Sequence, residues 1–119
     1  MEALDIDIIL IPFSSNGVSD ELSENVLVHQ GFLNAYNSVQ DDVLTTVASQ
    51  LQQFPSYSLI STGHSLGGSL ASIGGISLAA NFPGVPLGVF TFGQPRTGSP
   101  EYAALAENLI GADNIFRGE

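Results

Sequence analysis

A strand-forming run of the chain leads into a serine flanked by glycines, and a helix of small residues follows at once. Residues 57–62 (YSLIST) include the β-branched Ile60 and Thr62 beside Tyr57 and Leu59, and we interpret them as a buried strand. Residues 63–67 (GHSLG) form the junction, and the small residues from about Ser65 to Ala80 predict a helix that packs closely on a sheet. A strand joined to a helix by a tight turn is the unit of α/β proteins, so this junction constrains the chain to that class.

The rest of the chain alternates between strands and helices in the same way. We expect further strands over residues 5–11, 26–28, 87–92 and 114–117, and helices over residues 32–54 and 101–110. The long helix is predicted from apolar residues at three- or four-residue spacing, and Pro55 ends it. Alternation of this kind predicts a mostly parallel sheet with helices on both of its faces. Residues 1–119 show no repeat and no linker, so we interpret them as a single partial domain.

The charge balance excludes several classes of partner. The chain has 12 acidic residues against 2 basic ones, Arg96 and Arg117, and a formal net charge of −10. Nucleic acids and anionic membranes both require several Lys or Arg contacts, so we expect neither as a partner. A neutral, apolar ester or lipid is compatible with this composition, of which 44% is hydrophobic.

The sequence also argues against several cofactors and targeting signals. It has no cysteine, and no spacing of His or carboxylate residues suggests a metal, so we expect neither a metal site nor a cofactor. No apolar run reaches the roughly 20 residues of a membrane span. The first residues lack the basic and apolar regions of a secretory signal, so we expect no signal peptide within this chain. No pattern in the sequence indicates the oligomeric state.

The pattern Gly63-x-Ser65-x-Gly67 between a strand and a helix predicts a nucleophile elbow. In such a turn the serine hydroxyl stands above the sheet edge, and the flanking glycines give room where a Cβ would clash. Ser65 would then be the nucleophile, and the backbone N–H of Leu66, at the helix N-terminus, would be one donor of an oxyanion hole. The alternative is that Ser65 only caps the helix, but the strand and the helix on its two sides favour the elbow.

Four stretches of the chain together resemble the class 3 lipases, the filamentous-fungal triacylglycerol lipase family of α/β-hydrolases. They are residues 28–32 (VHQGF), residues 62–68 (TGHSLGG), residues 91–96 (TFGQPR), and the Tyr102-Ala103 helix with the strand at residues 115–117 (IFR). The resemblance implies a truncated α/β-hydrolase fold, hydrolysis of acylglycerol esters by Ser65, feruloyl-type esterases as relatives, and secretion from the cell.

The same resemblance implies catalytic groups that these 119 residues do not contain. In the family, the second oxyanion donor precedes the part that this chain matches, and the triad Asp and His follow it. We interpret His29 and His64 as structural, Asp113 as a loop acid before the last strand, and Glu119 as too early for the triad acid. We therefore expect a fragment that hydrolyses esters poorly or not at all. The alternatives are a catalytically inactive lipase-like module that binds lipid or a partner, and a structural module without a ligand.

Overall fold

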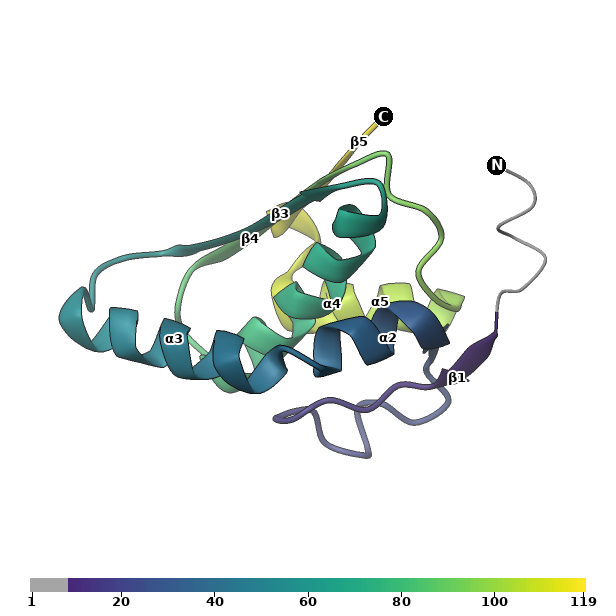
Figure 1. Ribbon diagram of the computed structural model, residues 1–119, viewed down its shortest axis with the longest axis horizontal. Helices are drawn as coiled ribbons and strands as arrows, with labels where there is room; N and C mark the ends of the chain where they lie inside the picture. Colours follow the sequence, from purple (N-terminus) through teal and green to yellow (C-terminus); the bar gives the residue numbers. More distant parts are fainter. Residues whose placement is uncertain (1–8) are drawn as a thin grey trace.

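The computed structural model describes residues 9–119 of the 119-residue chain (Figure 1). Its elements are, in order, strands β1 (Leu10–Pro12) and β2 (Leu27–His29), helices α2 (Gln30–Asn37) and α3 (Gln40–Gln53), strand β3 (Leu59–His64), helix α4 (Leu66–Asn81), strand β4 (Leu87–Phe92), helix α5 (Pro100–Ile110), the short 3-10 helix η1 (Ala112–Asn114) and strand β5 (Ile115–Gly118). The strand expected over residues 5–11 lies mostly outside the described residues. Its described end is β1, which extends to Pro12.

Strands β3, β4 and β5 form a parallel sheet in that order. In the observed register, Thr62 lies opposite Phe90, and Phe90 lies opposite Phe116. Helices α4 and α5 make the two crossovers, since parallel strands need a connection that returns along the sheet. β1 and β2 form a separate antiparallel pair, in which Pro12 lies opposite Leu27. The expected parallel sheet is therefore present, and the β1–β2 pair is an antiparallel addition to it.

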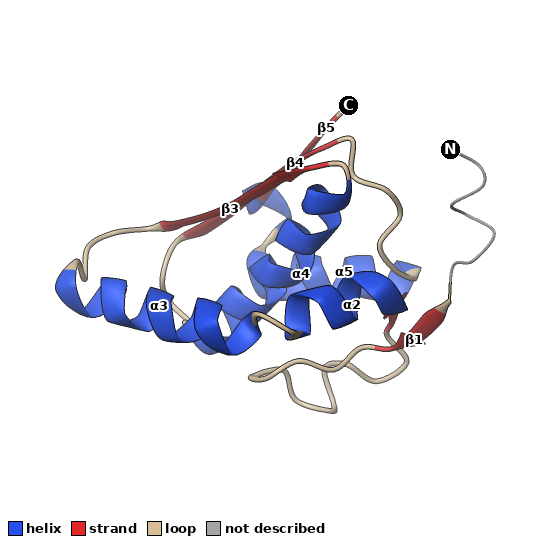
Figure 2. Cartoon of the chain, in the orientation of Figure 1, coloured by secondary structure: helices blue, strands red, loops and turns tan. Residues whose placement is uncertain are grey.

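Helix α4 is the centre of the structure, with β3 and β4 on one side of it and α2 and α5 on others (Figure 2). Its glycines permit this close approach. A Cβ on Gly75 would lie 2.6 Å from Val89 Cγ2 of β4, and a Cβ on Gly74 would lie 3.2 Å from Tyr36 Cε1 of α2. Because protein interiors are close-packed, any larger side chain at Gly75 would force the helix away from the sheet.

The hydrophobic core lies between α4, its neighbouring helices and the inner face of the sheet. Ile73 and Ile76 of α4 and Val28 of β2 are completely buried. Burying a side chain of this kind contributes about 1.5–3 kcal/mol. The other buried members of the core are Phe13, Val26, Leu33, Tyr36, Val89, Tyr102, Leu105, Ala106 and Ile110.

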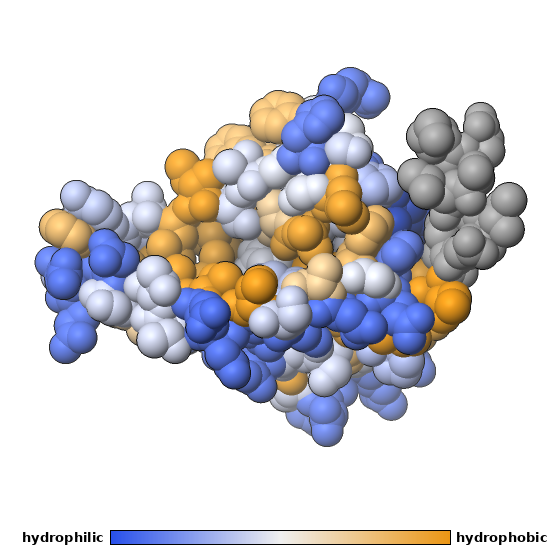
Figure 3. All heavy atoms as spheres, in the orientation of Figure 1, coloured by the Kyte–Doolittle hydropathy of each residue, from blue (hydrophilic) through white to orange (hydrophobic). Residues whose placement is uncertain are grey.

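The helices lie on one side of the β3-β4-β5 sheet, and within residues 9–119 its opposite face is uncovered (Figure 1). Ile60, Phe92 and Phe116 on that face are 68%, 48% and 48% exposed, and Phe90 stacks on Phe116 with ring centroids 4.6 Å apart. We call these four residues the bare face. Figure 3 shows apolar side chains along the top of the molecule, where Figure 1 places the sheet.

This arrangement differs from the expectation of helices on both faces, and the strand order explains why. Crossovers between parallel strands are almost always right-handed. The chain moves from β3 to β4 and then to β5 in one direction across the sheet. Two right-handed crossovers in the same direction place α4 and α5 on the same face.

The long helix predicted over residues 32–54 is two helices, α2 and α3, which meet at Ser38. Ser38 Oγ donates a hydrogen bond to a backbone carbonyl one turn earlier, over 2.7 Å. Gln40 is buried and its Oε1 accepts hydrogen bonds from Ser15 Oγ at 2.7 Å and from Ser77 Oγ at 3.2 Å. Side chains that bond to nearby backbone compete with a continuous helix. The apolar spacing could not reveal this break, because the partners of Gln40 are distant in the sequence.

Candidate active site

Ser65 lies at the turn between β3 and α4, in a backbone conformation that residues other than glycine rarely adopt. Its φ is 57° and its ψ is −122°. The Ser65 N–H donates a hydrogen bond to the carbonyl of Phe92 at the end of β4, with an N···O distance of 2.7 Å. Such a conformation costs about 1–3 kcal/mol and persists only where the surrounding structure fixes it. The Ser65 side chain is exposed.

The two glycines that flank Ser65 have different roles. A Cβ on Gly63 would overlap the backbone carbonyl of Gly67, and it would lie 2.9 Å from the N atom of Gly68. Position 63 is therefore closed to every other residue unless the turn opens. A Cβ on Gly67 would meet nothing within 4 Å. The expectation that both glycines relieve a clash is thus met at Gly63 and not at Gly67.

The first turn of α4 presents backbone donors next to Ser65. The first N–H groups of any helix have no partner within it. Here the N–H groups of Gly68 and Ser69 donate hydrogen bonds to the Ser65 carbonyl, at 2.8 and 3.3 Å. Leu66, the first residue of α4, comes directly after Ser65 at the positive end of the helix dipole. The Ser65 hydroxyl makes no capping hydrogen bond to α4. Capping therefore does not account for a serine at this position.

A chain of hydrogen bonds between side chains runs behind this turn. Thr91 Oγ1 donates to Gln94 Oε1 at 2.8 Å, Gln94 Nε2 donates to Thr97 Oγ1 at 2.8 Å, and Thr97 Oγ1 donates to Ser69 Oγ at 2.9 Å. Thr91, Thr97 and Ser69 are at most 4% exposed. The chain joins β4, the loop after it and the first turn of α4. The sequence predicts Gln94 only as part of a turn motif, and its three-residue spacing from Thr91 and from Thr97 is the signal that could have indicated this network.

Neither histidine of the chain contacts the Ser65 hydroxyl through a hydrogen bond within residues 9–119. His29 Nδ1 accepts a hydrogen bond from the Phe32 N–H at 3.3 Å, and its ring stacks on Phe32 at a centroid distance of 3.8 Å. His29 therefore caps α2. His64 is exposed at the end of β3, on the opposite face from α4, and its Nε2 would lie 3.8 Å from a Cβ on Gly93.

Two acidic residues near the end of the chain flank strand β5. Asp113 is exposed in η1, before β5, and Glu119 is exposed after β5. Within residues 9–119, no group of three or more His, Asp and Glu side chains lies close enough together to hold a metal ion. In the same part of the chain, no helix has the length and apolar character needed to cross a bilayer.

Comparison with known proteins gives consistent matches over almost the whole chain. The family model described as "Lipase (class 3)" matches residues 5–117. The chain is 39% identical over 100 residues to the lipase of Rhizomucor miehei, and the match covers 82% of this chain and 26% of that lipase. It is 39% identical over 79 residues to the secreted alkaline triacylglycerol lipase of Penicillium cyclopium, covering 66% of this chain and 27% of that protein.

Solved structures agree with these matches. The crystal structure of a triacylglycerol lipase from Penicillium expansum superposes with a TM-score of 0.86 at 31% sequence identity, and the match covers 94% of this chain and 42% of that one. The chain thus spans about a quarter of the length of the curated relatives and under half of the solved structure.

Proposed function

The chain belongs to the class 3 lipase family, with the α/β-hydrolase fold that its sequence predicts, and we propose that it supplies the nucleophile of a serine carboxylic ester hydrolase. The position of Ser65 carries this proposal: an exposed hydroxyl on a strained turn, beside the positive end of a helix. The relatives from Penicillium cyclopium and Penicillium expansum are named triacylglycerol lipases. We therefore propose neutral acylglycerol esters as the substrate class.

In the proposed reaction, Ser65 Oγ attacks the carbonyl carbon of the ester and loses its proton to a base. The bond between that carbon and the alcohol oxygen then breaks, and the alcohol leaves with the proton. Water hydrolyses the acyl-serine and releases the free acid. The Leu66 N–H would donate a hydrogen bond to the oxygen that carries negative charge in each tetrahedral intermediate.

The base is the component that these residues do not bring to Ser65. Both histidines are accounted for otherwise, His29 as a cap of α2 and His64 as an exposed residue on the far face of β3. Enzymes of this type that lose a triad member retain only about 10³–10⁴-fold catalysis over water, which depends on the oxyanion hole. We therefore propose that the 119-residue chain alone hydrolyses esters slowly or not at all.

A fluorophosphonate probe tests whether Ser65 is more reactive than an ordinary serine. The purified chain is incubated with the probe, and the labelled residue is located by peptide mass spectrometry. We expect slow labelling confined to Ser65, no labelling of the Ser65→Ala variant, and unchanged labelling of Ser38→Ala, which alters another exposed serine. Labelling spread evenly over many serines, or unaltered in Ser65→Ala, would overturn the assignment.

An ester assay with p-nitrophenyl butyrate tests the predicted rate. We expect a rate close to that of buffer, with little difference between the chain and Ser65→Ala. A fast rate that Ser65→Ala abolishes would support the nucleophile and contradict the predicted inactivity, since another group would then have to serve as base.

A lipase-like module that binds lipid without hydrolysing it is the second function we consider, and the bare face favours it. Its residues offer an exposed apolar surface of the kind that marks interaction sites. Flotation with phosphatidylcholine vesicles that contain triolein tests whether the chain binds lipid through this face. Binding that Ile60→Ser weakens would support it, and recovery of all the protein in the vesicle-free fraction would exclude it.

We further propose a secreted location, because the relative from Penicillium cyclopium is described as secreted. Detection of the protein in the culture medium of cells that express its natural gene would support this proposal. Retention of all the protein inside intact cells would contradict it.

A further inference from the structure

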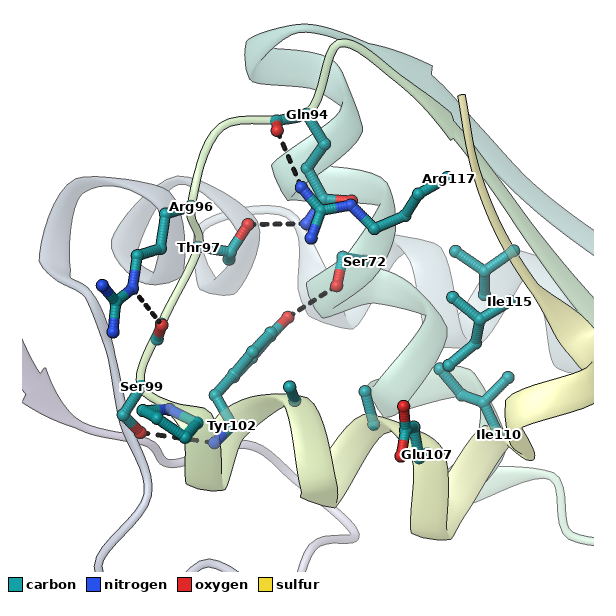
Figure 4. Close-up of a pocket in the computed structure, with 15 residues that line it drawn as sticks. Ser72, Gln94, Arg96, Thr97, Ser99, Tyr102, Glu107, Ile110, Ile115 and Arg117 are labelled. Carbon is teal, nitrogen blue, oxygen red and sulfur yellow. Dashed lines mark hydrogen bonds between the residues drawn. The ribbon is translucent and has the colours of Figure 1, made fainter. Parts of the chain in front are cut away.

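A cavity of about 430 Å³ lies between α4, the loop after β4, helix α5 and strand β5 (Figure 4). Its volume falls within the range of about 300–1,000 Å³ that is usual for small-molecule sites. Ser72 is the residue of α4 that lines it, and neither Ser65 nor any other residue of the turn at residues 63–67 does so. The cavity is therefore separate from the proposed nucleophile, and nothing in the proposed reaction uses it.

Both basic residues of this strongly acidic chain line the cavity. Arg96 Nε donates a hydrogen bond to the Gly98 carbonyl at 3.2 Å, and Arg117 Nη2 donates one to the Gln94 carbonyl at 2.9 Å. A guanidinium group has five N–H donors, so these single bonds hold each side chain in place and leave most of its donors for a ligand. Arg96 on the loop after β4 and Arg117 on strand β5 thus make this cavity the place where an anion meets the least repulsion from the chain.

The wall between α5 and β5 is apolar. Val89, Ala106, Ile110 and Ile115 contribute it. The hydroxyl groups of Ser72 and Tyr102, which also line the cavity, are 2.8 Å apart and bonded to each other. An alkyl chain that lies along this wall would therefore leave both of these hydroxyl groups paired.

One carboxylate, that of Glu107 on α5, also lines the cavity. Figure 4 draws Glu107 near Ile110, at the end away from Gln94, Arg96 and Arg117. The cavity is thus polar and cationic at one end and apolar, with a single negative charge, at the other. This polarity suits an anion that carries its charge at one end only.

We infer that the cavity between α5 and β5 binds a medium-chain alkyl carboxylate, with the carboxylate at Arg96 and Arg117 and the alkyl chain along Val89, Ile110 and Ile115. Guanidinium groups match a carboxylate in both charge and shape, and they form strong charge-assisted hydrogen bonds with it. The apolar wall distinguishes an alkyl acid from a small inorganic anion, which would gain nothing from it. The inference goes beyond the proposed function, because it does not depend on the chemistry of Ser65.

Isothermal titration with sodium octanoate, below its micelle concentration and at low salt, tests the site. We compare it with three probes, each of which lacks one feature: octanol lacks the charge, octyltrimethylammonium reverses it, and acetate lacks the chain. We expect one molecule of octanoate to bind at least about fivefold more tightly than each of the three. Equal affinities for octanoate and octanol would overturn the inference, because they would indicate adventitious apolar binding only.

Matched variants locate the binding. Arg96→Gln and Arg117→Gln should each weaken octanoate binding by about fivefold, because each removes a charged donor from an exposed site. Glu107→Gln should strengthen binding modestly, because it removes the like charge. Ile60→Ser on the bare face and Ser65→Ala should leave the affinity unchanged. Unaltered binding in both arginine variants, or loss of binding in Ile60→Ser, would place the ligand elsewhere.

Circular dichroism of each variant separates loss of the site from loss of the fold. The Ser65→Ala result also separates this inference from the proposed function. A variant that loses fluorophosphonate labelling but keeps octanoate binding shows that the two sites are independent. If the unaltered chain is not labelled at Ser65 and still binds octanoate, then only the proposed function fails.

Discussion

Thr97, on the loop after β4, donates a hydrogen bond to Ser69 in the first turn of α4, with 2.9 Å between their hydroxyl oxygens. Both residues are buried, although 28 positions separate them in the sequence. Thr97 Oγ1 also accepts a hydrogen bond from Gln94 Nε2 at 2.8 Å. The loop is thereby tied to the same turn of helix that follows Ser65, so the position of the proposed nucleophile depends on a loop some thirty residues away.

Replacing Thr97 with valine should test this connection at nearly constant volume. The change leaves the Gln94 amide without its acceptor and Ser69 Oγ without its donor, so we expect the free energy of unfolding to fall by about 1–3 kcal/mol. Urea denaturation followed by circular dichroism measures this loss. Thr45→Val makes the same exchange at an exposed position of α3, and its effect should stay within about 0.5 kcal/mol. Equal effects of the two changes would show that the buried connection contributes nothing.

The two glycines around Ser65 should respond oppositely to alanine. In Gly63→Ala the new Cβ would overlap the Gly67 carbonyl, so we expect a loss of at least about 3 kcal/mol or failure to fold. In Gly67→Ala the Cβ meets nothing within 4 Å, and alanine favours a helix over glycine by about 1 kcal/mol. Thermal unfolding of both variants should therefore shift in opposite directions from the parent chain. A large loss in Gly67→Ala would contradict the open space that the structure gives it.

Glycine at position 65 should stabilise the chain relative to alanine there. Ser65 has a φ of 57° and a ψ of −122°, a combination that glycine adopts without the strain of about 1–3 kcal/mol that other residues incur. We expect the free energy of unfolding of Ser65→Gly to exceed that of Ser65→Ala by about 1 kcal/mol or more. Both variants lack the hydroxyl, so the comparison isolates the backbone. Asn25→Gly, at φ 63°, should change stability less, because asparagine tolerates positive φ. If Ser65→Ala were the more stable variant, the turn would not be strained.

The junction around Ser65 could be predicted from the sequence because its signals are local. Residues 57–62 favour an extended strand, the small residues after Ser65 favour a helix, and Gly63 between them marks the change. The structure places β3, the turn and α4 there, with β3 ending two residues later than expected. The local pattern could not show that Gly67 relieves no clash, because this depends on how α4 is placed relative to the turn.

Two other features depend on contacts that no local pattern contains. At the break between α2 and α3, Gln40 accepts hydrogen bonds from Ser15 and Ser77, which lie 25 and 37 positions away. The cavity beside α5 brings Arg96 and Arg117 together from a loop and from β5. The sequence showed that these are the only basic residues, but not that they share one site.

Tyr102 should make the chain less stable at high pH. Burial raises the pKa of the Tyr102 phenol far above its ordinary value of about 10, and the hydrogen bond with Ser72 offsets this only in part. Below pH 10 both states hold the proton. As the pH rises above 10, the unfolded chain releases the proton while the folded chain retains it, so the free energy of unfolding falls, by up to about 1.4 kcal/mol per pH unit.

Urea unfolding at several pH values between 9 and 11 measures that slope. Tyr102→Phe should be less stable at pH 7, because it loses the bond to Ser72, but its stability should fall less steeply at high pH. Ser72→Ala breaks the same hydrogen bond while keeping the phenol, so its slope should remain. Burial also raises the pKa of Tyr36, so Tyr102→Phe should reduce the slope rather than abolish it. Identical slopes for the parent chain and Tyr102→Phe would refute the assignment.

The bare face should make the isolated chain self-associate as its concentration rises. Ile60, Phe92 and Phe116 stand 48–68% exposed on one face of a sheet, and removing such apolar area from water is worth about 25 cal/mol per Å². Ile60→Thr and Phe116→Thr each leave a β-branched residue, which favours a strand, while they shrink this apolar area. We therefore expect each to raise the concentration at which association begins. Sedimentation velocity at several concentrations measures the effect. Val39→Thr, at a residue of the α2–α3 junction that is 47% exposed, controls for loss of surface hydrophobicity in general. If Val39→Thr reduces association as much as Ile60→Thr does, then the contact between copies is not made by the bare face.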